Sequence, residues 1–142
     1  MEAADVQAMP PLDVPRMLHV LLVEDSSPVR ARIRSLIEES NAAEVVGEAD
    51  SVAAACLLLQ VAPVDAVVLD LHLGDGDGCE VLAQVKRTCP DCLVIVLTSF
   101  SDAADRLRCL ELGADHFFDK TREFERVPEV LADLGRRLAP PA

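Results

Sequence analysis

Five residues with chemically active side chains lie at or just beyond the ends of short apolar runs. The acidic pair Glu24 and Asp25 follows one run, Asp70 follows a second, Thr98 follows a third, and Lys120 lies just past a fourth. If these runs are parallel strands, their carboxyl ends meet at one edge of a sheet. Three carboxylates, one hydroxyl and one ammonium group would then share a single site with a net charge of about −2.

Such a cluster favours a divalent cation. Two like unit charges about 4 Å apart repel by about 1 kcal/mol in water and by about 4 kcal/mol at an effective dielectric constant near 20. A small set of oxygen ligands with room for water suits Mg²⁺ better than zinc or a fully caged Ca²⁺. A cation and a lysine around a carboxylate are also what phosphoryl transfer requires, and Asp70 is the candidate nucleophile.

The elements that would position these residues alternate along the chain. Apolar runs that predict strands alternate with longer segments of helical period or composition. Five such runs with apolar inner members predict an α/β fold, a doubly wound five-stranded parallel sheet covered by five helices. The predicted strands are 18–23, 44–47, 66–69, 93–97 and 116–118.

Three of the five predicted helices carry start or stop signals. The first is expected to begin at an N-cap Ser27 followed by Pro28, and the fourth, 102–112, at Ser101 with a stop at Gly113. The second, 52–60, is apolar nearly all round and is expected to be well buried. The third is expected over 79–88 with Val81, Leu82 and Val85 facing inward, and the last ends at Leu138 with Pro128 in its first turn.

Length and charge exclude several functional classes. The chain has 142 residues and a net charge of −12, so it should form one domain without the cationic surface that nucleic acids require. The longest uncharged stretch, residues 51–64, is shorter than the roughly 20 residues of a membrane span. No secretory signal is recognised, and five cysteines, an odd number, predict a reduced, cytoplasmic protein. We expect a disordered lead-in over 1–16, a domain over 17–138 and a tail over 139–142.

Four sequence motifs, in this order and spacing, resemble the receiver domain of two-component response regulators of the stand-alone, single-domain type. The motifs are LLVED (21–25), VVLDLHLGDGDG (67–78), VLTS (96–99) and GADHFFDK (113–120). The resemblance implies a flavodoxin-like fold with strand order 2-1-3-4-5. It also implies a signalling switch rather than an enzyme, which accepts a phosphoryl group from a phosphohistidine with Mg²⁺ as cofactor. The implied partners are a sensor histidine kinase or histidine phosphotransfer protein and a protein effector, with no direct contact to nucleic acid or membrane.

The same resemblance assigns roles to individual residues. Asp70 is the implied phosphoacceptor, and Asp25 is the direct metal ligand, with Glu24 acting partly through water. The backbone carbonyl of His72 completes the protein's share of the metal coordination. Three further residues act on the phosphorylated state: Thr98 binds a phosphoryl oxygen, Lys120 is the counter-ion, and Phe117 is the aromatic switch.

The sequence departs from the common receiver pattern at four places. Its acidic pair is Glu-Asp rather than Asp-Asp, and Phe117 replaces the usual Tyr. Gly74 and Thr121 stand where proline is usual, which predicts a more mobile loop after Asp70 and leaves open the cis peptide bond after Lys120. The expected effector surface, and a possible homodimer interface, is the fourth helix, fifth strand and fifth helix, about 102–137.

Several alternatives stay open at this stage. A phosphorylation-independent scaffold and an aspartyl-phosphate phosphatase are the rival functions. Arg30 and Arg34 are either a docking surface for a phosphotransfer helix or a solvated face with an Arg34–Glu38 pair. His72 is a candidate influence on the water that attacks the acyl phosphate. The C-x-x-C at 89–92 is interpreted as a loop with incidental cysteines, and the glycine-rich stretch 74–78 as a simple turn.

Overall fold

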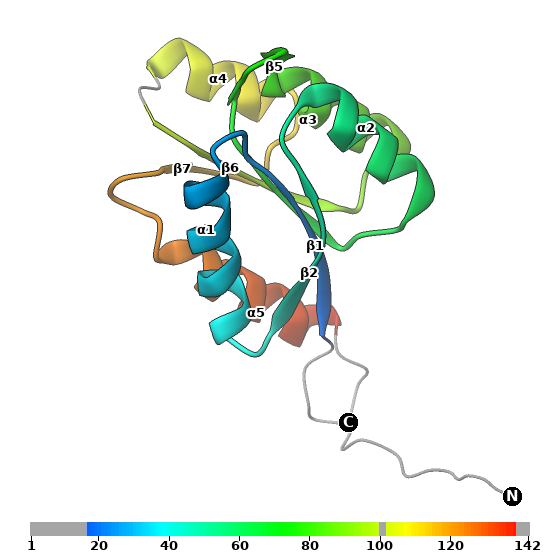
Figure 1. The fold of residues 1–142 in the computed structure, drawn as a ribbon, viewed down its shortest axis with the longest axis vertical. Coiled ribbons are helices and arrows are strands. Elements are labelled where there is room, and N and C mark those ends of the chain that lie inside the picture. The colour runs from blue at the N-terminus through cyan, green and yellow to red at the C-terminus, as the bar shows by residue number, and fades with distance from the viewer. Residues whose placement is uncertain (1–16, 100–101, 139–142) are drawn as a thin grey trace, which may run out of the picture.

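A five-stranded parallel sheet forms the centre of the molecule (Figure 1). The computed structural model describes residues 17–99 and 102–138. Within this part the strand order is β2-β1-β3-β6-β7, which confirms the predicted order 2-1-3-4-5 once the five sheet strands are numbered along the chain. The strands are β1 (Leu18–Val23), β2 (Ala43–Ala49), β3 (Ala66–Leu69), β6 (Leu93–Thr98) and β7 (His116–Asp119).

Five helices cover the two faces of this sheet, so the doubly wound prediction is confirmed. Helices α1 (Ser27–Glu39) and α5 (Arg126–Leu138) lie on one face (Figure 1). Helices α2 (Val52–Val61), α3 (Gly78–Thr88) and α4 (Ala103–Glu111) lie on the other. Alternate side chains of each central strand enter the two resulting cores, for example Leu21 and Val23 on one side and Val20 and Leu22 on the other. Because β3 and β6 are buried along their whole length, they read as continuous apolar runs.

The helix start signals were misplaced by one residue in two cases. Ser26, not Ser27, caps α1, since its hydroxyl accepts a hydrogen bond from the Val29 amide. Asp102 caps α4 by accepting from the Asp105 amide at 2.8 Å, whereas the predicted cap Ser101 lies outside the described residues. Both corrections follow one rule: the residue that caps is the one whose side-chain oxygen reaches an amide three residues on.

Other helix predictions are confirmed. Val81, Leu82 and Val85 of α3 are fully buried, and Pro128 lies in the first turn of α5. Gly113 follows α4 with a φ of +103°, a conformation that glycine adopts without steric cost. The Ala114 amide then donates to the Cys109 carbonyl at 2.9 Å, which satisfies a terminal carbonyl of the helix.

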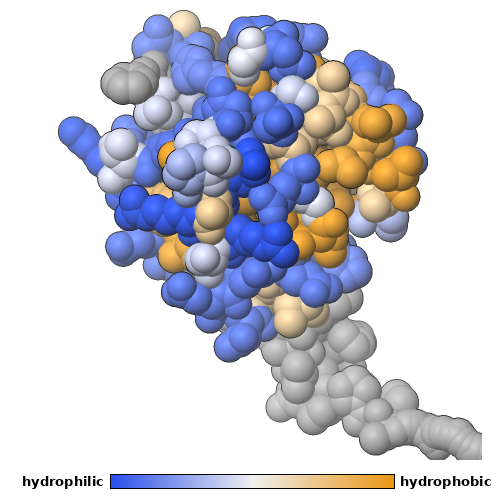
Figure 2. Space-filling model, in the orientation of Figure 1, coloured by the Kyte–Doolittle hydropathy of each residue, from blue (hydrophilic) through white to orange (hydrophobic). Residues whose placement is uncertain are grey.

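Helix α2 is more exposed than its apolar sequence predicts. Only Ala55 is buried, while Leu57 and Val61 are 62% and 70% exposed. The helix covers an outer part of the sheet and has no element over its other side, so one face of it meets solvent. Hydrophobic surface accordingly gathers over this helix in Figure 2.

The glycine-rich stretch after Asp70 contains more than a simple turn. Residues His72–Leu73 (β4) and Gly76–Asp77 (β5) pair as a two-stranded antiparallel hairpin. Gly78 closes the loop directly against the backbone at the end of β3, since a Cβ there would lie 2.3 Å from the Asp70 carbonyl oxygen. The sequence predictions for 1–16 and 139–142 lie outside the described residues. No helix in the described part is long and apolar enough to cross a membrane.

Candidate active site at the carboxyl edge of the sheet

The hydrogen-bond ladder of the sheet fixes the backbone of the predicted site residues. The amide of Glu24 donates to Ala49 in β2 at 2.9 Å, and that of Asp70 donates to Val23 in β1 at 3.0 Å. The amide of Lys120 donates to the carbonyl of Thr98 at 2.8 Å. Each residue is thus held one position past its own strand by the neighbouring strand. The four stretches of sequence meet at one edge, as predicted.

Asp70 lies at the centre of this site. Its carboxylate is 6% exposed and accepts hydrogen bonds on both oxygens. Oδ1 accepts from the Thr98 hydroxyl at 2.9 Å and from the His72 amide at 3.2 Å. Oδ2 accepts from Lys120 Nζ at 2.9 Å. These three donors fix the orientation of the buried carboxylate.

Lys120 is shared between two buried carboxylates. Its Nζ lies 2.7 Å from Glu24 Oε1 and 2.9 Å from Asp70 Oδ2. Burial acts to lower the pKa of Lys120, but hydrogen bonds and charges from Glu24 and Asp70 outweigh it, so the pKa is raised. The ammonium group therefore stays charged at neutral pH.

The pKa of the Glu24 carboxylate is also subject to opposing effects. Its carboxylate is 2% exposed, and it accepts from Lys120 and, at 3.1 Å, from the Ser26 amide. Burial raises its pKa above the usual range, and the nearby charge of Asp70 adds to this, against the opposing hydrogen bonds from Lys120 and Ser26. One lysine does not fully compensate two buried carboxylates, so the site retains excess negative charge.

The donor set fits a hard divalent cation. Carboxylate oxygens of Glu24, Asp25 and Asp70 lie within 4.8 Å of one another. Asp25 is exposed, whereas the other two are buried. Oxygen ligands around a partly open, negatively charged position are what Mg²⁺ selects, because it keeps several of its waters. The His72 amide donates a hydrogen bond to Asp70. The backbone carbonyl of His72 remains a predicted metal ligand.

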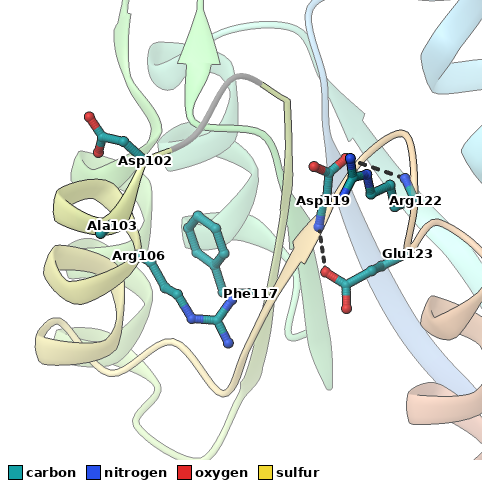
Figure 3. Close-up of a pocket in the computed structure, with 7 residues that line it drawn as sticks. All are labelled: Asp102, Ala103, Arg106, Phe117, Asp119, Arg122 and Glu123. Carbon is teal, nitrogen blue, oxygen red and sulfur yellow. Dashed lines mark hydrogen bonds between the residues drawn. The ribbon is translucent and has the colours of Figure 1, made fainter.

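The predicted switch residue Phe117 lies beside a cavity next to the site. The cavity has a volume of about 400 Å³ between α4 and the loop after β7. The Phe117 ring is buried, and the Arg106 guanidinium lies 5.6 Å from its centroid (Figure 3). On the opposite wall the Asp119 amide donates to Glu123 at 3.0 Å. Because the Phe117 side chain is buried in the core, its ring is turned inward in this structure.

Arg30 and Arg34 both form ion pairs within the protein, so neither is a free docking residue. Arg30 Nη1 donates to the Glu24 carbonyl at 2.7 Å, and its Nε pairs with Glu48 at 2.9 Å. Arg34 also pairs with Glu48, and with Glu38 at 3.5 Å. Sequence reasoning found the Arg34–Glu38 pair and missed Glu48, because the register of β2 beside α1 is needed to place it.

Two aspartates of the loop after Asp70 were also missed as structural residues. Asp75 accepts from the amides of Val52 and Ala53 and so caps α2 across the loop. Asp77 caps α3 through the Cys79 amide and forms an ion pair with Arg108 of α4 at 2.7 Å. For Asp77 the usable signal was an aspartate directly before a helical segment. Among the described residues no peptide bond is cis, so Lys120–Thr121 is trans.

The fold and this cluster define a receiver domain. The family model for the response regulator receiver domain matches residues 20–132, and the chain belongs to this family. Receiver domains of two-component systems act in phosphorelay signalling, interact with histidine kinases or phosphotransfer proteins, and bind Mg²⁺ at an acidic pocket.

Individual relatives support the same assignment. The photosynthetic apparatus regulatory protein RegA of Cereibacter sphaeroides is 31% identical over 122 residues, 86% of this chain and 65% of RegA. The response regulator VraR of Staphylococcus aureus is 31% identical over 119 residues, 84% of this chain and 57% of VraR. The chain thus spans less than two thirds of these curated relatives.

Solved structures agree on the fold. The receiver domain of the putative response regulator NarL of Mycobacterium tuberculosis has a TM-score of 0.77 and 25% identity, covering 86% of this chain and 98% of that one. The RcsB response regulator of Salmonella typhimurium has a TM-score of 0.76 and 25% identity, covering 89% and 63%.

Proposed function

We propose that the protein accepts a phosphoryl group from a phosphohistidine donor onto Asp70 in a Mg²⁺-dependent reaction, and that it signals through a protein contact. The observation that carries this proposal is the arrangement around Asp70. A buried carboxylate has a lysine on one oxygen and a hydroxyl on the other, with two further carboxylates close by.

The charges of the site suit this transfer. A phosphohistidine brings negative charge to a cluster that is already negative, so the reaction requires cations at the transferred group. Asp25, Glu24 and Asp70 would hold Mg²⁺, and the ion would supply charge neutralisation there. Lys120 already lies at the carboxylate that attacks and needs only to turn its ammonium group from Asp70 toward a phosphoryl oxygen.

Thr98 would connect the reaction to the surface. Its hydroxyl now donates to Asp70 Oδ1, and phosphorylation of Asp70 would offer it a phosphoryl oxygen instead. Movement of Thr98 at the end of β6 would change the space available to Phe117 on the adjacent strand β7. The cavity beside Phe117 would then favour a second ring position and alter the surface of α4, β7 and α5. This surface is our proposed effector site and possible homodimer interface.

The proposed partners are a sensor histidine kinase or a histidine phosphotransfer protein, and an effector protein. We propose that this domain makes no direct contact with nucleic acid, because its net charge is −12. The solved RcsB structure concerns DNA interaction, and the present chain covers 63% of that RcsB chain. Arg30 beside the site is a proposed contact for the phosphodonor, although it also holds the Glu24 carbonyl.

Incubation with acetyl phosphate and Mg²⁺, followed by intact mass measurement, tests the proposal. We expect one phosphoryl group per chain with Mg²⁺ and strongly reduced labelling when the metal is chelated. Asp25→Asn should lose the Mg²⁺-dependent labelling. Asp65→Asn, an acid at the opposite edge of the sheet, is the matched control and should label like the wild type. Equal labelling with and without metal would contradict the metal role, and no labelling at all would favour a phosphorylation-independent scaffold.

A further inference from the structure

A pair of cysteines closes the turn between α3 and β6, at the edge of the sheet opposite Asp70. Cys89 directly follows α3 and is exposed, whereas Cys92 directly precedes β6 and is 2% exposed. The Cys92 amide donates to the Cys89 carbonyl at 3.0 Å, so the four residues form a β-turn. Such a turn brings its end Cα atoms within about 7 Å, near the range that a disulfide spans. Cys89 lies close enough to Cys92 to contribute to the raised pKa of the Cys92 thiol.

The pair lies on the wall of a cavity of about 330 Å³. The opposite wall is formed by the end of α2 and the segment that leads into β3, including Leu59, Val61 and Val64. Val61 lines this cavity and is 70% exposed, so the cavity adjoins the exposed hydrophobic surface of α2. A small disulfide can therefore reach the exposed Cys89 sulfur. The carbon groups of that disulfide can pack against the apolar side chains that line the cavity.

We propose that Cys89 and Cys92 form a reversible dithiol–disulfide site that reacts with low-molecular-weight disulfides of the glutathione type. The Cys89 thiolate attacks one sulfur of the disulfide, which forms a mixed disulfide and releases the other half as a thiol. The Cys92 sulfur, after losing its proton, attacks Cys89 and displaces the second half as a thiol. Two electrons and two protons thus pass from the protein thiols to the small disulfide, and one intramolecular S–S bond forms.

Position in the fold assigns the two roles. Cys89 is exposed and attacks, because exchange requires access to the incoming disulfide. Cys92 is buried, and burial raises its pKa to about 12, so it reacts only with a sulfur that is already held beside it.

A second cysteine pair in the same chain supplies an internal comparison. Cys79 of α3 and Cys109 of α4 also lie close enough for each to affect the pKa of the other. Both are buried, at 3% and 0% exposure, and burial raises the pKa of each. Because no reagent of glutathione size reaches either sulfur directly, this pair should stay reduced under conditions that oxidise Cys89 and Cys92.

The test is oxidation of the full chain in mixtures of glutathione and its disulfide, followed by alkylation, intact mass and peptide mapping. In the wild type we expect loss of two of the five alkylatable thiols and a disulfide mapped to Cys89 and Cys92. Cys92→Ser should retain one glutathionyl group on Cys89. Cys89→Ser should retain all its remaining thiols, and Cys56→Ser, the matched control, should oxidise like the wild type.

Three outcomes would overturn the proposal. They are five free thiols in the wild type under excess glutathione disulfide, a disulfide mapped to Cys79 and Cys109, and a Cys92→Ser variant without an adduct on Cys89. Circular dichroism of each variant establishes that it is folded. Asp70→Asn should oxidise like the wild type, because the cysteine site is independent of the proposed phosphorylation.

Discussion

Acidic residues lie at both edges of the sheet, and their partners differ. At the amino edge, Asp65 accepts from the His19 amide at 2.8 Å, and Asp115 accepts from the Val94 amide at 2.8 Å and from Lys86 at 2.9 Å. At the carboxyl edge, Glu24 and Asp70 share one lysine. The amino-edge acids complete the backbone hydrogen bonding of strands. The carboxyl-edge acids hold excess charge that a ligand can neutralise.

Removal of the shared cation should have the largest effect. Lys120→Met leaves two buried carboxylates without their counter-ion, and we expect the free energy of unfolding to fall by about 3 kcal/mol at pH 7. Urea denaturation measures it, with Lys86→Met at the amino edge as the matched control. Because Lys86 pairs with a single carboxylate, Asp115, that is 36% exposed, its loss should cost less. Equal losses of stability in the two variants would contradict the proposed difference between the two edges of the sheet.

Steric closure at the carboxyl edge gives the next largest effect. Gly78→Ala places a Cβ 2.3 Å from the Asp70 carbonyl oxygen and 2.8 Å from the Leu71 Cα, and backbone atoms cannot move aside cheaply. We expect a loss of about 2 kcal/mol in unfolding free energy. Gly74→Ala, four residues earlier, meets nothing within 4 Å and should be close to neutral. A neutral Gly78→Ala would show that α3 does not pack against the Asp70 backbone as described.

A smaller loss is expected at the amino edge. Asp115→Ala leaves the buried Val94 amide without its side-chain acceptor, which should cost about 1 kcal/mol. Asp115→Asn keeps an oxygen for this amide and loses only the charge, so it should cost less. If Asp115→Asn destabilised the fold as much as Asp115→Ala, the charge would matter here too, and the two edges would not differ as proposed.

The smallest expected effect is a difference between Glu24 and Asp75 in how their contributions to stability depend on pH. The folded-state pKa of Glu24 is raised from 4.5, mainly by burial, so its contribution to stability is fully present below the unfolded pKa and is lost as the pH rises through the folded pKa. Asp75 has a pKa lowered from 3.8 by backbone hydrogen bonds, chiefly from Val52, against a smaller effect of burial. Its contribution is present above the unfolded pKa and is lost as the pH falls.

Denaturation curves measured across acid pH should therefore diverge in opposite directions. Relative to the wild type, Glu24→Gln should become less stable as the pH falls through the folded pKa of Glu24. Asp75→Asn should approach the wild type as the pH falls below 3.8. Parallel pH profiles for the two variants would contradict the assigned pKa directions.

Much of the fold could be read from the sequence because its strands are continuous apolar runs. The bounds of β1 and β3 were predicted correctly, and the strand ends placed Glu24, Asp70, Thr98 and Lys120 together. The exposure of α2 could not be predicted, because periodicity does not show which elements cover a helix. Glu48 beside Arg30 was missed for a related reason, since that pair depends on how α1 lies against β2.

The central claim is that Asp70 carries the phosphoryl group, and borohydride reduction of the acyl phosphate after labelling with acetyl phosphate and Mg²⁺ tests it most directly. Reduction converts a phosphorylated aspartate to homoserine, which peptide mass spectrometry locates. We predict homoserine at residue 70 in the wild type and none anywhere in Asp70→Asn. Homoserine at Asp25 or another acid in the wild type, or undiminished labelling of Asp70→Asn, would contradict the claim.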